Sequence, residues 1–224
     1  YTKALSGQKD TACVTCHANL LGGGDELALP LGPSVEDSDV LGPGRKLTPR
    51  GTPVPRNSPT TFNVAIWDKH LLWDGRIESL GKTPLLQGND GNGISTPEFG
   101  HGKEDPTGDI SLLQTHIRFP VSAEPVMRGL HGPDLERMDY TRCMAERLGA
   151  YGECGDDLEQ TDWLTHFKEV YGDELSPLEQ RLSDEELAPV LLRFERISRA
   201  LVAYEHTLNF VETPWAEYVT GERG

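Results

Sequence analysis

The most regular hydrophobic pattern of the chain lies near its C-terminal end. Apolar side chains recur there at three- and four-residue steps, at Leu187, Val190, Leu191, Phe194, Ile197, Leu201, Tyr204 and Leu208. This spacing places them on one face of an α-helix. Ser183 and Glu186 form a capping-box pattern before it, and Pro189 predicts a kink in its second turn. The pattern therefore predicts a long amphipathic helix with a core-facing side.

Helical patterns also cover residues 110–119, 134–148 and 158–171, and a short helix is expected around residues 13–17. Pro120 is expected to stop the first of these and Gly172 the third. No segment alternates as a half-buried strand does. Gly- and Pro-rich stretches at 21–60 and 88–109 predict long ordered loops. The expected fold class is mainly α, a single domain over residues 1–224 with long Gly/Pro-rich loops.

Composition narrows the choice of partners. The 224 residues carry a formal net charge of −15, which argues against nucleic acid because phosphate binding needs a basic face. The acidic field suits a basic redox partner, or it serves only to keep the protein dispersed in water. The sequence shows no transmembrane run and no signal peptide. Tyr1 is not an initiator Met, so we expect a processed or trimmed chain.

The stretch Cys13-Val14-Thr15-Cys16-His17 reads C-x-x-C-H, the attachment signature of a c-type haem. Two cysteines one helical turn apart reach the two vinyl groups of one porphyrin, and His17 then becomes the proximal iron ligand. A thioredoxin-like redox pair would need a βαβ context, and a zinc half-site would need a second ligand pair. Neither accompanies the motif, so we predict one covalent haem c.

The other two cysteines, Cys143 and Cys154, flank a Gly-containing turn and predict a disulfide in an oxidising compartment. Haem attachment to C-x-x-C-H also takes place outside the bacterial cytoplasm. We therefore expect an exported protein, periplasmic or extracellular.

Several stretches resemble the bacterial di-haem cytochrome c peroxidase family, which includes the MauG-like proteins. They occur in the family's order over nearly the whole chain: Ala4–Gly7 before the haem motif, Arg56–Asn63, Leu72–Arg76, Phe119–Ser122 with Met127–Gly129, Ala200–Leu208 and Tyr218–Glu222. The resemblance implies a cytochrome-c-like fold that carries the family's first, N-terminal haem.

In the peroxidases, this haem is where hydrogen peroxide is reduced. A second domain with its own haem c relays electrons from a small cytochrome or a cupredoxin. The resemblance thus implies a peroxidase-like oxidoreductase enzyme, with a second haem domain or subunit as partner. Two alternatives stay open: an electron-transfer subunit of a larger cytochrome assembly without turnover, and oxidation of a partner protein as in the MauG-like relatives. An oligomer is also open.

The chain departs from the family in two respects. It has no second C-x-x-C-H, so either it is a cleaved or partial chain or the second haem belongs to another polypeptide. Aligning on Pro120 also puts Gln114 where the peroxidases have a catalytic glutamate. Glutamine forms hydrogen bonds but does not shuttle a proton, so Glu124 and Glu78 are alternative candidates.

The sixth ligand of the iron separates the two main functions, because an open position permits peroxide chemistry and a bound His or Met favours electron transfer. His116 is the leading distal candidate, as a catalytic or ligating residue, since it lies on the pocket helix four residues before Pro120. His70, His101 and Met127 are alternatives. We expect the remaining histidines, His131, His166 and His206, to be structural or solvent-facing.

Further cofactor contacts are expected around the motif. Arg76 and Arg45 are candidates to pair with haem propionates, although Arg76 could instead pair with Asp74 or Asp68. Trp67 and Trp73 are expected either as pocket walls or as electron relays.

Calcium is a further, weaker expectation. The family often holds it between domains, and Asn57 lies in the corresponding motif. Asn89, Asp90, Asn92 and Glu98 form no EF-hand pattern.

Overall fold

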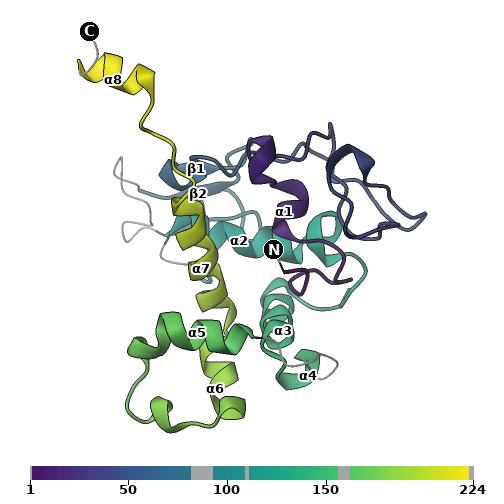
Figure 1. The fold of residues 1–224 in the computed structure, drawn as a ribbon, viewed down its shortest axis with the longest axis vertical. Helices are drawn as coiled ribbons and strands as arrows, with labels where there is room; N and C mark the ends of the chain where they lie inside the picture. Colours follow the sequence, from purple (N-terminus) through teal and green to yellow (C-terminus); the bar gives the residue numbers. More distant parts are fainter. Residues whose placement is uncertain (1, 82–92, 109–110, 156–161, 222–224) are drawn as a thin grey trace. The chain divides into compact units, whose positions relative to one another are not determined.

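The computed structural model describes residues 2–81, 93–108, 111–155 and 162–221 (Figure 1). The chain forms two compact units. The first comprises Tyr1–Cys16, Asp25–Ser58 and Arg118–Ala200, and the second comprises His17–Gly24, Pro59–Ile117 and Leu201–Gly224. Because the units interleave along the sequence, neither can be cut out as one continuous segment. A single haem domain over residues 1–224 stays a prediction.

The predicted fold class is confirmed, since the described elements are mainly helical. The first unit contains α1 (Cys13–Cys16), η2 (Gly42–Gly44), η4 (Glu124–Arg128, a π-helix), α3 (Arg137–Gly149), α4 (Gly152–Gly155), α5 (Trp163–Tyr171), η5 (Gly172–Glu174), η6 (Glu179–Arg181) and α6 (Asp184–Leu191). The second contains η1 (Asn19–Leu21), η3 (Val64–Ile66), β1 (His70–Leu71), β2 (Ile77–Ser79), β3 (Ile94–Ser95) and α8 (Pro214–Thr220). Residues of α2 (Leu112–Ser122) and α7 (Phe194–His206) belong to both units.

The C-terminal amphipathic pattern forms two helices rather than the one expected. The capping box is confirmed: the Ser183 hydroxyl accepts from the Glu186 amide, and the Glu186 carboxylate accepts from the Ser183 amide. Pro189 lies inside α6, which ends at Leu191, and α7 begins at Phe194. Proline removes one helical hydrogen bond and crowds the turn that precedes it, whereas this break follows Pro189, so Pro189 alone does not explain it.

The other predicted helices are present, and some of their boundaries differ from expectation. α2 continues through Pro120 to Ser122, so Pro120 does not stop it. In its last turn, the Ser122 hydroxyl donates to the Arg118 carbonyl at 2.7 Å. α3 matches the predicted helix within three residues at its start. α5 starts at Trp163 and ends before Gly172 as predicted; residues 158–161 of that prediction lie outside the described residues.

A small antiparallel sheet, β1-β2-β3, was missed at the sequence level. Its strands are two or three residues long, which is too short for an alternation of polar and apolar residues to be recognised in the sequence. Residues 72–76 form the turn between β1 and β2, and Leu72 and Gly75 adopt positive φ there. This turn presents Trp73 at its tip.

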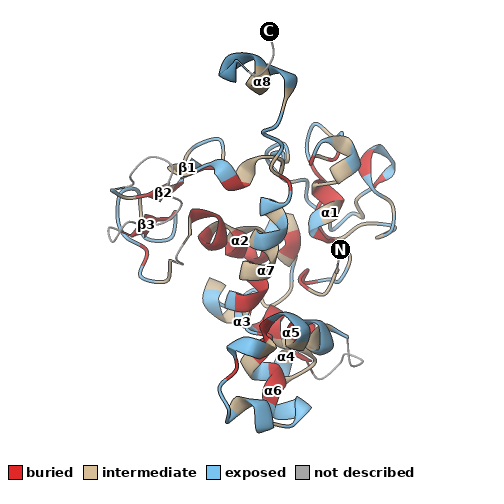
Figure 2. Ribbon diagram, turned by 60° about the vertical axis from the view of Figure 1, so that its left-hand side comes forward, coloured by how far each residue is buried: buried red, intermediate tan, exposed pale blue. Residues whose placement is uncertain are grey.

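Each unit has its own core, drawn red in Figure 2. In the first unit, the α3 side chains Tyr140, Met144 and Leu148 are fully or nearly fully buried, as are Leu191 and Leu192. The predicted Cys143–Cys154 disulfide is present and links α3 to α4. The second unit buries Ile77, Ile94, Leu112 and Leu113. α8, in contrast, has no buried residue.

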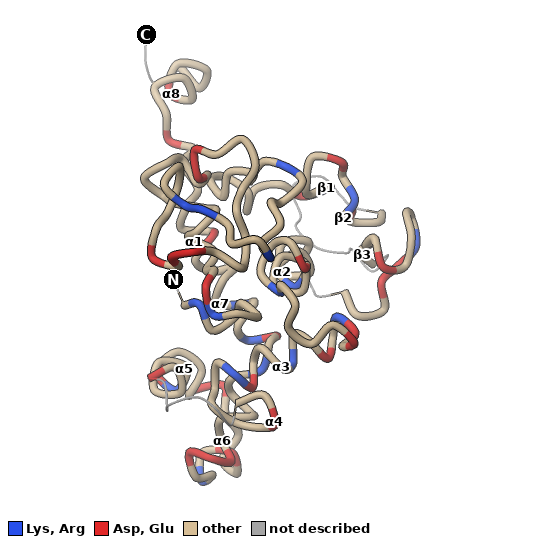
Figure 3. Tube along the Cα trace, turned by 90° about the vertical axis from the view of Figure 1, so that its right-hand side faces the viewer, with Lys and Arg blue, Asp and Glu red and all other residues tan. Residues whose placement is uncertain are grey.

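The long loop predicted at residues 21–60 is ordered, as expected. Isolated bridges pair Leu31 with Pro53 and Val35 with Leu47. Acidic side chains occupy the first turn of α6 (Figure 3), where they complement the helix dipole. None of the helices in the described ranges has the length and apolar character needed to cross a membrane.

Candidate haem site

The two motif cysteines lie on the single turn of α1. Cys13 is exposed and Cys16 is buried. The Thr15 hydroxyl accepts a hydrogen bond from the Ala12 amide at 3.0 Å, which closes the start of the turn. Burial, reinforced by the Asp25 carboxylate and opposed by the Arg45 guanidinium, raises the pKa of Cys16 to about 12. Sequence reasoning missed Asp25, because its position after a glycine run indicated only a turn.

Arg45 is held by contacts within the first unit. Its side chain is buried, and all three nitrogens of its guanidinium donate to oxygens of the first unit: the carbonyls of Asp10, Leu31, Gly32 and Val40 and the hydroxyl of Thr11. Pairing of Arg45 with a haem propionate stays a prediction, although these acceptors already use most of its N–H donors.

His17 follows Cys16 and opens a tight turn in the second unit. Its Nδ1 lies 3.1 Å from the carbonyl oxygen of Gly23. A carbonyl only accepts, so Nδ1 donates and the ring's lone pair is on Nε2. Metal-binding histidines are commonly oriented in this way. Gly23 adopts φ +78° and leaves no room for a side chain, since a Cβ would lie 2.8 Å from the Thr61 amide nitrogen.

His116 lies on α2, as the sequence predicted. Burial lowers its pKa to about 4, and the nearby His17 and Arg76 lower it in the same direction. All three residues belong to the second unit. His116 is thus an uncharged imidazole close to the predicted proximal ligand, and it keeps part of its surface accessible.

The other distal candidates are placed differently. His70 and His101 are exposed and flank Glu78, with Nε2 to carboxylate distances of 3.4 and 3.9 Å. Met127 is buried in η4, in the first unit, where its carbonyl accepts from the Gly7 amide. Of the distal candidates, His116 is the one whose pKa the nearby His17 lowers among the shifts resolved for the described residues.

The three candidates for proton transfer differ in their burial and in the charges around them. Gln114 is buried on α2, two residues before His116. Glu124 is exposed at the start of η4. Partial burial would raise the pKa of Glu78, but Lys69, at 3.1 Å, together with His70 and His101 holds that pKa below its usual range. Glu78 is thus held as a carboxylate within an ion-pair cluster.

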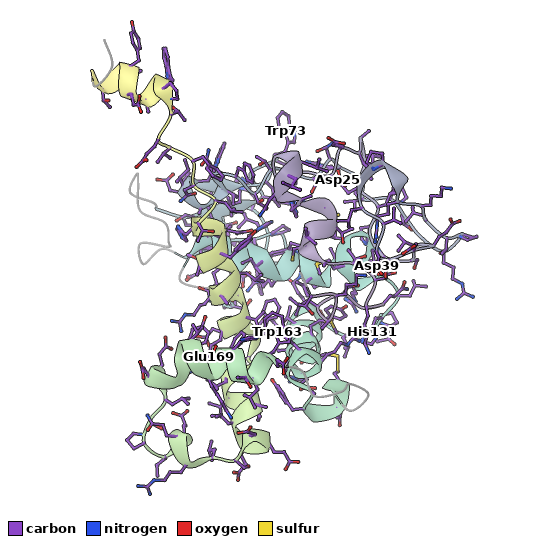
Figure 4. The ribbon with its side chains drawn as sticks, in the orientation of Figure 1. Asp25, Asp39, Trp73, His131, Trp163 and Glu169 are labelled. Atoms are coloured by element: carbon purple, nitrogen blue, oxygen red, sulfur yellow. A yellow bond between two sulfur atoms is a disulfide. The ribbon has the colours of Figure 1, made fainter. Side chains whose placement is uncertain are left out.

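Both predicted tryptophans lie at the surface. Trp67 is 62% exposed and Trp73 is 94% exposed. Trp73 projects away from the chain at the tip of the β1–β2 turn (Figure 4). Arg76, at the end of the same turn, has its Nε 3.5 Å from an Asp74 carboxylate oxygen, one of the alternatives that the sequence left open.

A calcium site receives no support from the described residues. The Asn57 amide donates to the carbonyls of Leu27 and Ala28, and its role in calcium binding stays a prediction. Asn89, Asp90 and Asn92 lie outside the described residues. Within the described ranges, no cluster of three or more His, Cys, Asp or Glu side chains is arranged to hold a metal ion.

The donor set fits a haem c. Two cysteines lie one turn apart, the next residue is an imidazole oriented by a backbone carbonyl, and a second uncharged imidazole lies close to it. Cys13 and Cys16 would hold the porphyrin through thioethers, and His17 Nε2 would ligate the iron.

Comparison with known proteins agrees with this chemistry. The cytochrome-c peroxidase IdrP1 of Denitromonas iodatirespirans is 31% identical over 134 residues, which cover 60% of this chain and 28% of that protein. The chain thus matches about a quarter of the length of this relative. The model of the di-haem cytochrome c peroxidase family matches residues 1–224. The chain therefore belongs to the di-haem cytochrome c peroxidase family, whose members are haem c oxidoreductases.

Proposed function

We propose that this chain carries one haem c on Cys13 and Cys16, with His17 as proximal ligand, and reduces hydrogen peroxide on the opposite face of the iron. The observation that carries the proposal is the uncharged His116 beside His17 and Arg76. A neutral imidazole at this position has the protonation state that a general base needs.

Residues of the second unit would have different roles in this reaction. The Gly23 carbonyl orients the His17 ring, so that Nε2 would ligate the iron of a bound haem. His116 would take a proton from bound peroxide and return it to the departing oxygen. Arg76 would stabilise the negative charge that develops as the O–O bond breaks. The haem, when bound, supplies two electrons to peroxide, and with two protons the products are two water molecules.

The electrons would come from the second haem of the family, supplied in turn by a small cytochrome or a cupredoxin. Membership of a di-haem family supports the second haem. Export to the periplasm or cell exterior is supported by the haem-attachment motif and by the Cys143–Cys154 disulfide, which forms in oxidising compartments. The number of haems and the identity of the donor belong to this proposal.

One observation also favours a second function. An uncharged imidazole close to the proximal histidine is a natural sixth ligand, and a six-coordinate haem transfers electrons without binding peroxide. In that case the chain is an electron-transfer module, and His116 is an iron ligand rather than a proton carrier.

The variant His116→Ala distinguishes the two functions, with the exposed His101→Ala as the matched control. Under the peroxidase proposal, the wild-type ferric haem is high-spin by EPR. His116→Ala then keeps that spin state and loses about 10²-fold in the rate of peroxide reduction with a reduced small cytochrome as donor. A low-spin wild type that becomes high-spin in His116→Ala would establish the electron carrier and contradict the peroxidase.

A further inference from the structure

Arg45 is a buried cation whose acceptors are all neutral oxygens. Its side chain is 3% exposed. Its Nε donates to the Leu31 carbonyl at 2.9 Å and its Nη1 to the Val40 carbonyl at 3.2 Å. Its Nη2 contacts the carbonyls of Asp10 and Gly32 and the hydroxyl of Thr11, at 3.1 to 3.2 Å. Burying a guanidinium is costly, so five acceptors around it indicate a fixed position.

Two of these acceptors, Asp10 and Thr11, lie directly before α1. Arg45 therefore ties residues 31–40 of the long loop to the segment that leads into the haem-attachment turn. The Asp10 carboxylate strengthens the same junction by accepting from the Ser34 amide at 2.7 Å. The turn that carries Cys13 and Cys16 thus begins from a segment held by a planar, five-donor side chain.

The charge of Arg45 reaches the attachment cysteine as well. Its guanidinium lowers the pKa of Cys16, whereas the buried Asp25 carboxylate raises it. Burial would lower the pKa of Arg45 itself, and Cys16 and Asp10 oppose that change. Because Arg45 is buried and its Nη2 donates to the hydroxyl of Thr11, two residues before Cys13, a haem on this turn would lie near a buried cation.

We propose that Arg45 is a positioning residue for the haem-attachment turn and that its buried charge raises the reduction potential of the haem c on Cys16. The inference rests on haem attachment as proposed above. Reduction adds one electron from the donor to ferric iron, giving ferrous iron, and no bond forms or breaks. A fixed positive charge nearby favours the reduced form, and low dielectric strengthens the effect.

The test uses Arg45→Gln, which removes the charge, and Arg45→Lys, which keeps it but cannot reproduce the planar fork. The matched control is Arg147→Gln. Arg147 is also buried and also donates to backbone carbonyls, those of Ser6 and Gly7, but it is not among the charges that act on Cys16. Haem content by pyridine haemochrome, the ferrous-to-ferric ratio at a fixed ambient potential, and the thermal midpoint are measured for each haem-loaded protein.

All three variants should lower the thermal midpoint. Arg45→Gln should also lower the ferrous-to-ferric ratio about tenfold, Arg45→Lys should recover most of that loss, and Arg147→Gln should leave the ratio unchanged. An unchanged ratio in Arg45→Gln, or an equal drop in Arg147→Gln, would overturn the proposal. A wild type without haem would instead overturn the haem proposal itself.

If Arg45→Gln does not fold, the variant Asp25→Asn tests whether buried charge near Cys16 sets the reduction potential. Asp25 is the buried anion near Cys16, so neutralising it should raise the ferrous-to-ferric ratio. An unchanged or lower ratio would show that buried charge near Cys16 does not set the potential, and the proposal would fall.

Discussion

At the scale of single residues, the proximal and distal sides of the candidate haem site differ in how they are specified. The proximal side follows from local sequence: His17 comes after Cys16, and the glycine turn brings the Gly23 carbonyl to its Nδ1. The distal side depends on α2, far away in the sequence. Periodicity marked His116 as a residue of that helix, but only the fold shows that it lies near His17 and stays uncharged.

Glu205 provides a pH-dependence prediction. Its Oε2 is buried and has no hydrogen-bond partner among the residues that the structure describes, and burial raises its pKa from 4.5 to about 7. The folded state therefore holds a proton that the unfolded chain releases near pH 4.5. Stability present below pH 4.5 is lost as the pH rises through about 7. Glu205→Gln should remove that loss, about 1–3 kcal/mol in the free energy of unfolding.

The measurement is urea unfolding of wild type and Glu205→Gln between pH 4 and pH 8, at intervals of about half a unit. The exposed Glu212→Gln, which changes the net charge equally, is the control. Parallel stability curves for wild type and Glu205→Gln would contradict a neutral, buried Glu205 carboxyl.

At the scale of elements, sequence patterns predicted most helices and missed what depends on contacts. The C-terminal stripe and the Ser183–Glu186 box predicted α6 and α7, because amphipathic spacing and capping are local. The break after Leu191, the continuation of α2 through Pro120 and the three short strands were not predicted. The strands depend on pairing with residues elsewhere in the chain, which a local pattern does not record.

The capping box gives a prediction at this scale. Ser183→Ala removes the oxygen that accepts from the Glu186 amide, and the free energy of unfolding should fall by about 1 kcal/mol. Chemical denaturation measures this directly. Ser176, which forms the same reciprocal contacts with Glu179 at η6, supplies a comparison. A Ser183→Ala protein as stable as wild type would mean that the box does not set the start of α6.

The Cys143–Cys154 disulfide closes a short loop between α3 and α4. Cys143 and Cys154 should resist alkylation in the native protein until a reductant is added, as mass spectrometry can follow. Replacing both by Ser should cost about 3 kcal/mol, because the unfolded chain regains the entropy of the open loop. Ready labelling of Cys143 without reductant would rule the bond out in solution.

At the scale of the whole molecule, the interleaved units explain why composition and motif order predicted a haem domain but not its internal division. The CxxCH motif itself runs from the first unit into the second, since Cys16 ends one segment and His17 begins the next. The family match over residues 1–224 concerns the chain as a whole. The net charge of −15 is likewise a property of the whole chain.

The pyridine haemochrome spectrum of Cys16→Ala, compared with wild type after export and haem maturation, tests the central claim most directly. Wild type should show the spectrum of a haem held by two thioethers. Cys16→Ala should show the shifted band of a haem held only through Cys13, or no covalent haem. An unchanged two-thioether spectrum in Cys16→Ala would contradict haem attachment at this motif, and with it the account of the site.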